Sequence, residues 1–334
     1  MTARAVVLPA PRGTIAVEHR DFHEPGPGEV LLRMEACGIC HSDLFVSGLE
    51  KLPRSPVILG HEGIARVETV GPEVTGWRPG DRAGMTFLAN TCGACDLCIS
   101  GRERFCAKQT NFGYSLDGAL SEWAIAPAGA LVRMPADLQA EVAAPLCCAG
   151  WTAYGALRQA GLTAGQSVAL FGFGGLGHLA FQIARFENLR VAVADISGAK
   201  IEQARAAGAD LVVGAANAGR ALQKEAGGVD AAIVLTPSPE AIQQAFRSVK
   251  RTGTVVLVGI STNQYELPLA DTIVKGIHIR GSYLGTRKDL DDVIALARAG
   301  TLRPSVQTHS IGEAPAALEK LRRGEIAGRA VITF

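Results

Sequence analysis

The chain has 334 residues, of which 48% are hydrophobic and 19% charged, and its 33 basic and 32 acidic side chains leave a net charge of +1. This composition excludes a disordered chain, and the near-neutral charge gives no sign of a nucleic-acid or membrane-surface partner. The length favours two domains.

The N-terminal stretch MTARAVVLPAPRG lacks the long apolar core of a signal peptide, and no apolar run reaches the length of a membrane span without interruption. We therefore expect a soluble, cytoplasmic protein.

The eight cysteines all lie between Cys37 and Cys148. In a reducing compartment they favour metal ligands or buried thiols over disulfides.

Residues 1–148 contain short β-like runs broken by glycine and proline, such as EVLLRMEA at 29–36 and IARVETVG at 64–71. This pattern predicts an irregular, mostly antiparallel β domain.

From residue 149 onward, apolar runs alternate with helical stretches, and the five runs lie at 167–173, 190–196, 210–215, 229–235 and 253–260. Strands that are apolar throughout are buried on both faces, which predicts an α/β domain with a doubly wound parallel Rossmann sheet. Residues 278–284 are a candidate sixth strand. The C-terminal segment reads as a helix at 288–300, a loop, a second helix and a last strand at 330–334. We assign 149–285 to the dinucleotide-binding domain and expect 286–334 to return to the first domain.

The stretch GFGGLG follows one of these strands and opens a helix, and it comprises Gly172, Phe173, Gly174, Gly175, Leu176 and Gly177. Glycines at this spacing allow a tight turn and a close approach of the backbone to a pyrophosphate. The next strand ends in Asp195, whose carboxylate can accept both hydroxyls of an adenosine ribose and would repel a 2′-phosphate. Lys200 could reach the same ribose. This predicts NAD rather than NADP, although Asp195 could instead only cap the following helix.

Four cysteines follow the C-x2-C-x2-C-x7-C pattern, and they are Cys92, Cys95, Cys98 and Cys106. Such short spacings suit tetrahedral Zn²⁺, and an iron–sulfur cluster is the competing interpretation. A closed set of four thiolates leaves no open coordination position, so we assign this site a structural role.

A second group of ligand-type residues is spread over three motifs, CGICHSD at 37–43, LGHEG at 59–63 and PLCCAGWTAY at 145–154. One cysteine from the first, His61 from the second and one cysteine from the third would leave a fourth position for water or substrate. Three protein ligands with an open position are typical of a catalytic zinc.

These motifs, with PEVTGWRPGDR, GYSLDGALSEW and the closing GRAV, occur in an order that resembles the zinc-containing alcohol dehydrogenases of the medium-chain dehydrogenase/reductase superfamily. The resemblance covers essentially the whole chain. It implies a GroES-like first domain and two zinc ions per chain. The short link between the cysteine lobe and NFGYSLDGALSEW looks like the tetrameric bacterial and yeast type, so the resemblance implies a homotetramer, with a homodimer as the alternative.

The resemblance also implies roles for individual residues. It assigns the catalytic zinc to Cys40, His61 and Cys148, with Glu62 as a transient ligand. Asp43 would orient His61, and the Ser42 hydroxyl would bond the substrate oxygen. The expected cofactor contacts are His41 and Arg329, at the pyrophosphate, together with Thr152 and Val258. Cys37 and Cys147 are expected to be packing thiols. Leu88, Trp151 and Phe45 are candidate walls of an apolar substrate pocket.

Many relatives carry a histidine at the position of Phe45, where it ends a proton relay. Phenylalanine cannot transfer a proton, so we expect the proton to leave by water or through the cofactor ribose.

The function implied is reversible hydride transfer between a primary or secondary alcohol and NAD⁺. The alternatives are a polyol, amino-alcohol or formaldehyde dehydrogenase of the same superfamily, or a non-catalytic dinucleotide-binding zinc protein.

Overall fold

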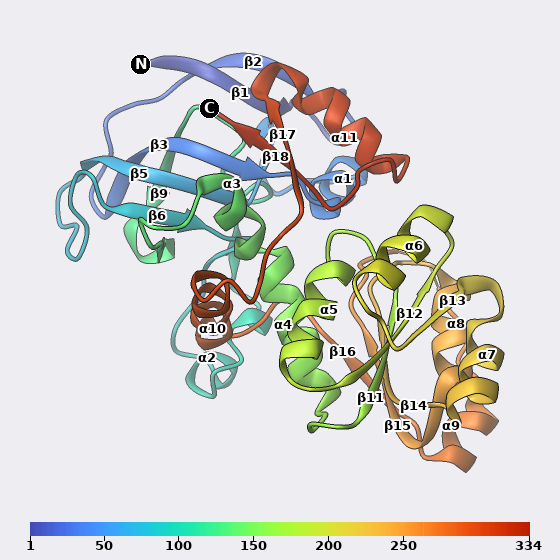
Figure 1. The fold of residues 1–334 in the computed structure, drawn as a ribbon. Helices are drawn as coiled ribbons and strands as arrows, with labels where there is room; N and C mark the ends of the chain where they lie inside the picture. Colours follow the sequence, from blue (N-terminus) through green and yellow to red (C-terminus); the bar gives the residue numbers. More distant parts are fainter. Residues whose placement is uncertain (263) are drawn as a thin grey trace. The chain divides into compact units, whose positions relative to one another are not determined.

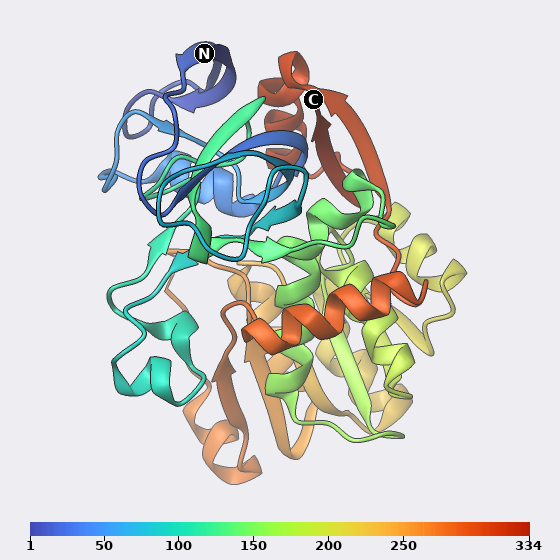
Figure 2. The ribbon, with the colours of Figure 1, turned by 90° about the vertical axis from the view of Figure 1, so that its left-hand side faces the viewer.

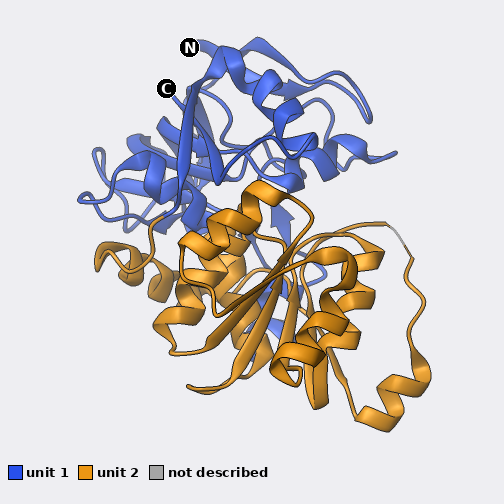
Figure 3. Ribbon diagram, turned by 45° about the vertical axis from the view of Figure 1, so that its right-hand side comes forward, with its two compact units in different colours: residues 1–148, 304–334 blue, residues 149–303 orange. Residues whose placement is uncertain are grey.

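The computed structural model describes residues 1–262 and 264–334 and separates into two compact units (Figure 3). Unit 1 comprises Met1–Cys148 and Pro304–Phe334, and unit 2 comprises Ala149–Arg303. The two segments of unit 1 meet in one sheet. No helix of the described residues is long and apolar enough to cross a lipid bilayer.

Unit 1 is built on a seven-stranded sheet in the order β10-β6-β5-β3-β18-β17, in which β9 also pairs with β3. A three-stranded sheet, β2-β1-β4, and a two-stranded sheet, β7-β8, complete it. Its strands are β1 (Thr2–Leu8), β2 (Ala16–Asp21), β3 (Glu29–Gly38), β4 (Val57–Ile58), β5 (Glu62–Val70), β6 (Arg82–Met85), β7 (Leu88–Asn90), β8 (Thr110–Asn111), β9 (Trp123–Pro127), β10 (Val132–Arg133), β17 (Val306–Ser310) and β18 (Arg329–Thr333). Its α-helices are α1 (His41–Gly48), α2 (Asp96–Ile99), α3 (Ala140–Ala143) and α11 (Ala314–Arg322), and its 3₁₀ turns are Glu103–Phe105, Ala128–Ala130, Ala144–Cys147 and Ile311–Glu313.

Every strand pairing in these sheets is antiparallel except that of β17 with β18. The long strand β3 places Val30, Leu32 and Met34 on one face, at the two-residue period of a strand. Leu318 and Leu321 of α11 belong to the same buried cluster. The predicted antiparallel β domain is therefore confirmed, with its core between the sheet and the C-terminal helix.

Unit 2 contains a six-stranded parallel sheet in the order β13-β12-β11-β14-β15-β16. Its strands are β11 (Ser167–Phe171), β12 (Arg190–Asp195), β13 (Leu211–Gly214), β14 (Val229–Val234), β15 (Val249–Leu257) and β16 (His278–Gly281). Its helices are α4 (Ala149–Ala160), α5 (Gly177–Phe186), α6 (Gly198–Ala206), α7 (Ala218–Ala226), α8 (Pro239–Ser248), α9 (Leu269–Lys275) and α10 (Arg287–Arg298), with a 3₁₀ turn at Ala215–Asn217.

Figure 1 shows α4 and α5 on one side of this sheet and α7 and α8 on the other. All five residues of β11 are buried, as expected for a central strand covered on both faces. The chain runs outward from β11 to β12 and β13 and then returns to start β14 on the other flank. This confirms the predicted Rossmann sheet, including its sixth strand.

Two details of the C-terminal segment differ from the sequence prediction. The stretch expected to be a loop contains the strand β17, which pairs with β18. The chain also rejoins unit 1 at Pro304 and not at residue 286. The reason is that α10 packs against α4 and so belongs to unit 2.

Candidate functional site

The four-cysteine lobe of unit 1 brings its thiols together. Figure 2 shows it in teal, as the segment that includes β7, α2 and β8. The four Sγ atoms all lie within 4.8 Å of one another, and they belong to Cys92, Cys95, Cys98 and Cys106. The Sγ–Sγ distance is 3.5 Å for Cys95–Cys98, 3.9 Å for Cys92–Cys98 and 4.0 Å for Cys95–Cys106.

These distances fit one tetrahedral ion. With Zn–S bonds of about 2.3 Å, two sulfurs of a tetrahedron lie about 3.8 Å apart. Hydrogen bonds from the backbone amides of Ala94 and Cys95, together with neighbouring thiols, lower the pKa of Cys92 to about 6. The lobe thus stabilises a thiolate, which is the form that binds zinc, and four sulfurs close the coordination shell.

A second group of ligand atoms lies at the end of the large sheet of unit 1. Cys40, His61, Glu62 and Cys148 are all buried, and one ligand atom of each lies within 4.8 Å of the others. Glu62 begins β5 and pairs with Gly38 at the end of β3, which brings the segments carrying Cys40 and His61 side by side. Cys148 follows the 3₁₀ turn Ala144–Cys147.

Asp43 orients two of these residues. Its Oδ1 lies 3.3 Å from Nδ1 of His61 and accepts the amide of Gly60 at 3.2 Å, while Oδ2 accepts the amide of Cys40 at 2.9 Å. The other ring nitrogen of His61, Nε2, is buried and has no hydrogen-bond partner among the described residues. A histidine held through Nδ1, with Nε2 directed to a group of thiols, suits a metal ligand.

Glu62 is paired with Arg329 inside this group. The Nη2 of Arg329 donates to Glu62 Oε1 and, at 3.0 Å, to the carbonyl of Ile39. Oε2 of Glu62 has no partner among the described residues and remains available to a cation. The pyrophosphate contact expected for Arg329 stays a prediction, because the contacts that the structure records for this 3% exposed side chain are with Glu62 and Ile39.

The charges of the site influence one another strongly. A hydrogen bond from the Cys148 thiol lowers the pKa of Cys40, and the same bond raises the pKa of Cys148. Burial raises the pKa of Glu62 to about 8, against the opposing effect of Arg329. Burial alone would lower the pKa of His61, but the Asp43 carboxylate and the Cys40 sulfur together outweigh it, and the net pKa is raised. Without a cation, the group therefore holds protons that a divalent metal would displace.

The remaining residues of the CGICHSDLF segment take separate positions. His41 is exposed and begins α1, and Ser42 is half-buried with its Oγ 3.7 Å from Sγ of Cys40. Phe45 is also half-buried. Cys37 and Cys147 are fully buried and belong to neither group of ligands.

The sequence interpretation missed the role of Gly38. A Cβ atom at this position would lie 1.9 Å from Oε2 of Glu62, so only glycine leaves room for that carboxylate. The glycine is visible in CGIC, but the contact depends on the register of two strands and has no local signal.

The glycine turn of unit 2 connects β11 to α5. Gly172 has a φ of +103°, and a Cβ at Gly177 would lie 2.1 Å from the carbonyl oxygen of Gly172. Asp195 ends β12 and is 6% exposed, with Oδ2 accepting the amide of Phe173 at 2.7 Å and Oδ1 that of Ser197 at 2.9 Å. Asp195 therefore connects the glycine turn to the start of α6 and does more than cap that helix.

The other cofactor candidates of unit 2 lie near the ends of its strands and helices. Lys200 Nζ would lie 3.8 Å from a Cβ at Gly174, next to the glycine turn. Val258 directly follows β15 and is 8% exposed, and Thr152, in the first turn of α4, is 9% exposed.

Trp151, a candidate pocket wall, is buried at the start of α4. Its ring is only 2% exposed, and Nε1 donates to the carbonyl of Thr286 at 2.6 Å. Leu88, in β7, is likewise 2% exposed. The apolar pocket expected from these side chains stays a prediction.

Two family models match the chain, the alcohol dehydrogenase GroES-like domain over residues 26–136 and the zinc-binding dehydrogenase over residues 175–299. The chain is 40% identical to an alcohol dehydrogenase of Geobacillus stearothermophilus over 91% of this chain and 92% of that protein. It is 38% identical to an alcohol dehydrogenase of Rhizobium meliloti over 99% of both chains.

Solved structures similar to this chain include proteins of the same family. The alcohol dehydrogenase of the archaeon Aeropyrum pernix superposes with a TM-score of 0.91 at 30% identity, over 99% of this chain and all of that chain. The acetophenone reductase of Geotrichum candidum, solved in complex with NAD, superposes with a TM-score of 0.89 at 30% identity, over all of this chain and 97% of that chain. The chain therefore belongs to the zinc-containing alcohol dehydrogenases of the medium-chain dehydrogenase/reductase superfamily.

Proposed function

We propose that the protein interconverts a primary or secondary alcohol and NAD⁺ with an aldehyde or ketone and NADH. The observation that carries this proposal is the buried group of Cys40, His61, Glu62 and Cys148, which accompanies a separate, closed set of four cysteines. Two thiolates and one imidazole leave a coordination position for substrate, whereas four thiolates do not.

The chain's own residues have distinct roles in this reaction. Cys40, His61 and Cys148 would hold a zinc ion, whose Lewis acidity would lower the pKa of an alcohol hydroxyl. Ser42, two residues beyond Cys40, accepts the hydroxyl proton and passes it on. Asp43 keeps the His61 ring in the orientation that directs Nε2 to the metal. Burial of all four ligand-type residues keeps water from the charged centre.

Unit 2 supplies the dinucleotide site in this proposal. Each oxygen of Asp195 accepts one backbone amide and keeps a further lone pair for the hydroxyls of the adenosine ribose. Ile196, directly after it, is 92% exposed and offers an apolar face to the adenine ring. The complex of the acetophenone reductase relative with NAD supports the same choice of cofactor. His41, Arg329, Val258 and Thr152 remain the other proposed cofactor contacts.

We propose a homotetramer, with a homodimer as the alternative. Support comes from β16, the edge strand of the parallel sheet, whose four residues are all exposed. Exposed apolar side chains occur on β16, at Ile279, and on the preceding helix α9, at Ile273 and Val274. An exposed edge strand presents unpaired backbone N–H and C=O groups that can pair with another chain. Sedimentation equilibrium would measure the assembly.

A cytoplasmic location remains our prediction from the sequence.

One experiment tests the proposed activity. Zinc per chain is measured on the purified protein, together with NADH formation over a panel of primary, secondary, aromatic and polyhydric alcohols. We expect two zinc ions per chain and turnover with at least one apolar alcohol. One zinc per chain would contradict the two-site assignment, and two zincs without turnover on any alcohol would favour a non-catalytic binding protein.

A further inference from the structure

The turn that follows β16 carries two unusual features. Ser282 is 7% exposed, and its hydroxyl has no hydrogen-bond partner among the described residues, although its backbone amide donates to Leu257 at 2.9 Å. Leu284, two residues on, has a left-handed φ of 54°. Non-glycine residues avoid this region unless the surrounding structure holds them there, and such residues gather at ligand sites. The segment 282–285 therefore needs a support and has a free buried hydroxyl.

Helix α4 provides the support. Trp151 donates its indole N–H to the carbonyl of Thr286 at 2.6 Å. Its ring lies against Gly285, where a Cβ would be 2.6 Å from both Cδ1 and Nε1. One helical turn later, Gly155 lets the carbonyl of Leu284 approach the helix, since a Cβ there would be 2.2 Å from that oxygen. Residues four apart share a helix face, so one face of α4 holds the turn from Leu284 to Thr286.

The position of this turn in the sheet connects it to the cofactor. In an open parallel sheet, ligands bind outside the carboxyl ends of the strands, around the point where the strand order reverses. Here the order reverses at β11, with β12 and Asp195 on one flank and β14, β15 and β16 on the other. With the adenosine on the Asp195 flank, the nicotinamide half lies over the ends of β14 to β16. Ser282 directly follows the carboxyl end of β16.

We propose that Trp151 is a positioning residue for the nicotinamide half of the dinucleotide. Through Thr286 and Gly285 it fixes the segment 282–285, so that the Ser282 hydroxyl and the adjacent backbone can hydrogen-bond the carboxamide. This inference rests on the proposed use of NAD. It replaces the expected role of Trp151 as a substrate-pocket wall, and it assigns the tryptophan an effect on cofactor affinity instead of alcohol affinity.

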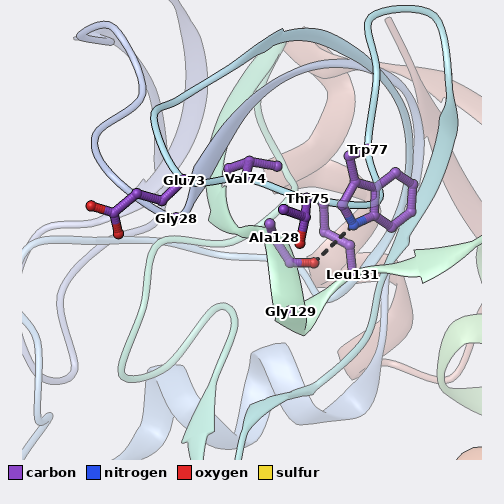
Figure 4. A pocket seen from close by; sticks show the side chains of 8 residues that line it. All are labelled: Gly28, Glu73, Val74, Thr75, Trp77, Ala128, Gly129 and Leu131. Atoms are coloured by element: carbon purple, nitrogen blue, oxygen red, sulfur yellow. Dashed lines mark hydrogen bonds between the residues drawn. The ribbon is translucent and has the colours of Figure 1, made fainter.

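The test compares Trp151→Phe with Trp77→Phe. Trp77 makes the same type of hydrogen bond, from Nε1 to the carbonyl of Ala128 at 3.0 Å (Figure 4). It belongs to unit 1 and borders a cavity of about 450 Å³. None of the proposed zinc or cofactor residues lines this cavity, so Trp77 is a suitable control. Both variants keep an aromatic ring and lose one N–H donor. Calorimetry measures the Kd of NADH and of ADP-ribose, which lacks the nicotinamide.

We expect Trp151→Phe to raise the NADH Kd and the NAD⁺ KM about three- to tenfold, the usual effect of one lost hydrogen bond. The ADP-ribose Kd, the alcohol KM and the zinc content should stay at wild-type values, and Trp77→Phe should change none of these quantities. An equal loss of NADH and ADP-ribose affinity, or no loss of either, would overturn the proposal. A wild-type protein that binds neither ligand would instead refute the use of NAD itself.

If Trp151→Phe does not fold, hydrogen–deuterium exchange on the wild-type protein decides. NAD⁺ should protect the amides of residues 282–286 and ADP-ribose should not. Equal protection by the two ligands, or none, would show that the turn does not respond to the nicotinamide.

Discussion

Asp43 and His61 are joined at 3.3 Å through Oδ1 and Nδ1, and both side chains are 1% exposed. The same carboxylate accepts the amides of Cys40 and Gly60, so it fixes two ligand-bearing segments at once. A buried carboxylate that orients a histidine ligand usually contributes a factor of about 10–100 to metal affinity.

Asp43→Asn should therefore lower zinc affinity at the catalytic site by about 10- to 100-fold and leave the four-cysteine site loaded. Zinc per chain, measured after dialysis against increasing chelator, should fall from two to one at lower chelator concentration than in the wild type. Asp117→Asn is the matched control, because Asp117 also accepts a backbone amide, that of Ile58, and pairs with Arg54. Equal zinc retention in the two variants would contradict the role of Asp43.

Gly38→Ala tests the steric requirement beside Glu62. The new Cβ would lie 1.9 Å from Oε2, so the carboxylate must move and its pairing with Arg329 must change. Overpacking of a buried site costs about 1–3 kcal/mol, and we expect a loss of that size in the free energy of unfolding by urea. Gly48→Ala is the control, since a Cβ added there would have no neighbouring atom within 4 Å and the change should be neutral. Equal stability of both variants would refute the contact.

Local patterns predicted much of this molecule. The Rossmann sheet followed from apolar strands alternating with helices, and the glycine turn from its place between a strand and a helix. Cys40, His61, Glu62 and Cys148 gather as the resemblance implied, because ligand-type residues are visible in the sequence.

Features that depend on distant pairing could not be predicted in the same way. Trp151 and Thr286 are 135 positions apart. A tryptophan in the sequence does not reveal which acceptor its indole N–H will find. Gly38 meets Glu62 only through strand register. The strand β17 was missed because its residues, VQTHS, are mostly polar and partly or fully exposed, so they carry no apolar alternation.

Asp230 provides a pH-dependent contribution to the stability of unit 2. Burial raises its pKa, but hydrogen bonds from Ser167 and Lys250 outweigh this, and the net pKa is lowered. A carboxyl with a depressed folded-state pKa stabilises the protein above its unfolded-state pKa, about 3.9, and loses that effect as the pH falls through the folded value.

Asp230→Asn should therefore reduce the free energy of unfolding at neutral pH, and its difference from the wild type should shrink below about pH 4. Urea titrations across this range measure the difference. Asp271→Asn, which removes a more exposed ion pair with Lys275, should show a small effect at every pH. A difference for Asp230→Asn that does not change with pH would contradict the assignment.

Asp195→Ala should weaken NAD⁺ binding and reduce the preference for NAD⁺ over NADP⁺ at least about tenfold, because the carboxylate both bonds the ribose and repels a 2′-phosphate. Ratios of kcat/KM for the two cofactors measure the change. Asp210→Ala is a suitable control, since Asp210 also accepts a strand amide, that of Val191, in the same sheet. An unchanged cofactor ratio in Asp195→Ala would exclude a ribose contact by this side chain.

Phe45 lies three residues after Ser42 on α1, and residues at this spacing share a helix face. Its ring cannot carry a proton, so the wild-type kcat should show no titration near pH 6.5, the ordinary pKa of histidine. In Phe45→His the neutral imidazole accepts a proton, and kcat for alcohol oxidation should rise with pH through that value. Phe45→Leu should keep the wild-type profile. If the histidine variant retains both the rate and the pH profile of the wild type, this position takes no part in proton transfer, and the proton leaves Ser42 by another route.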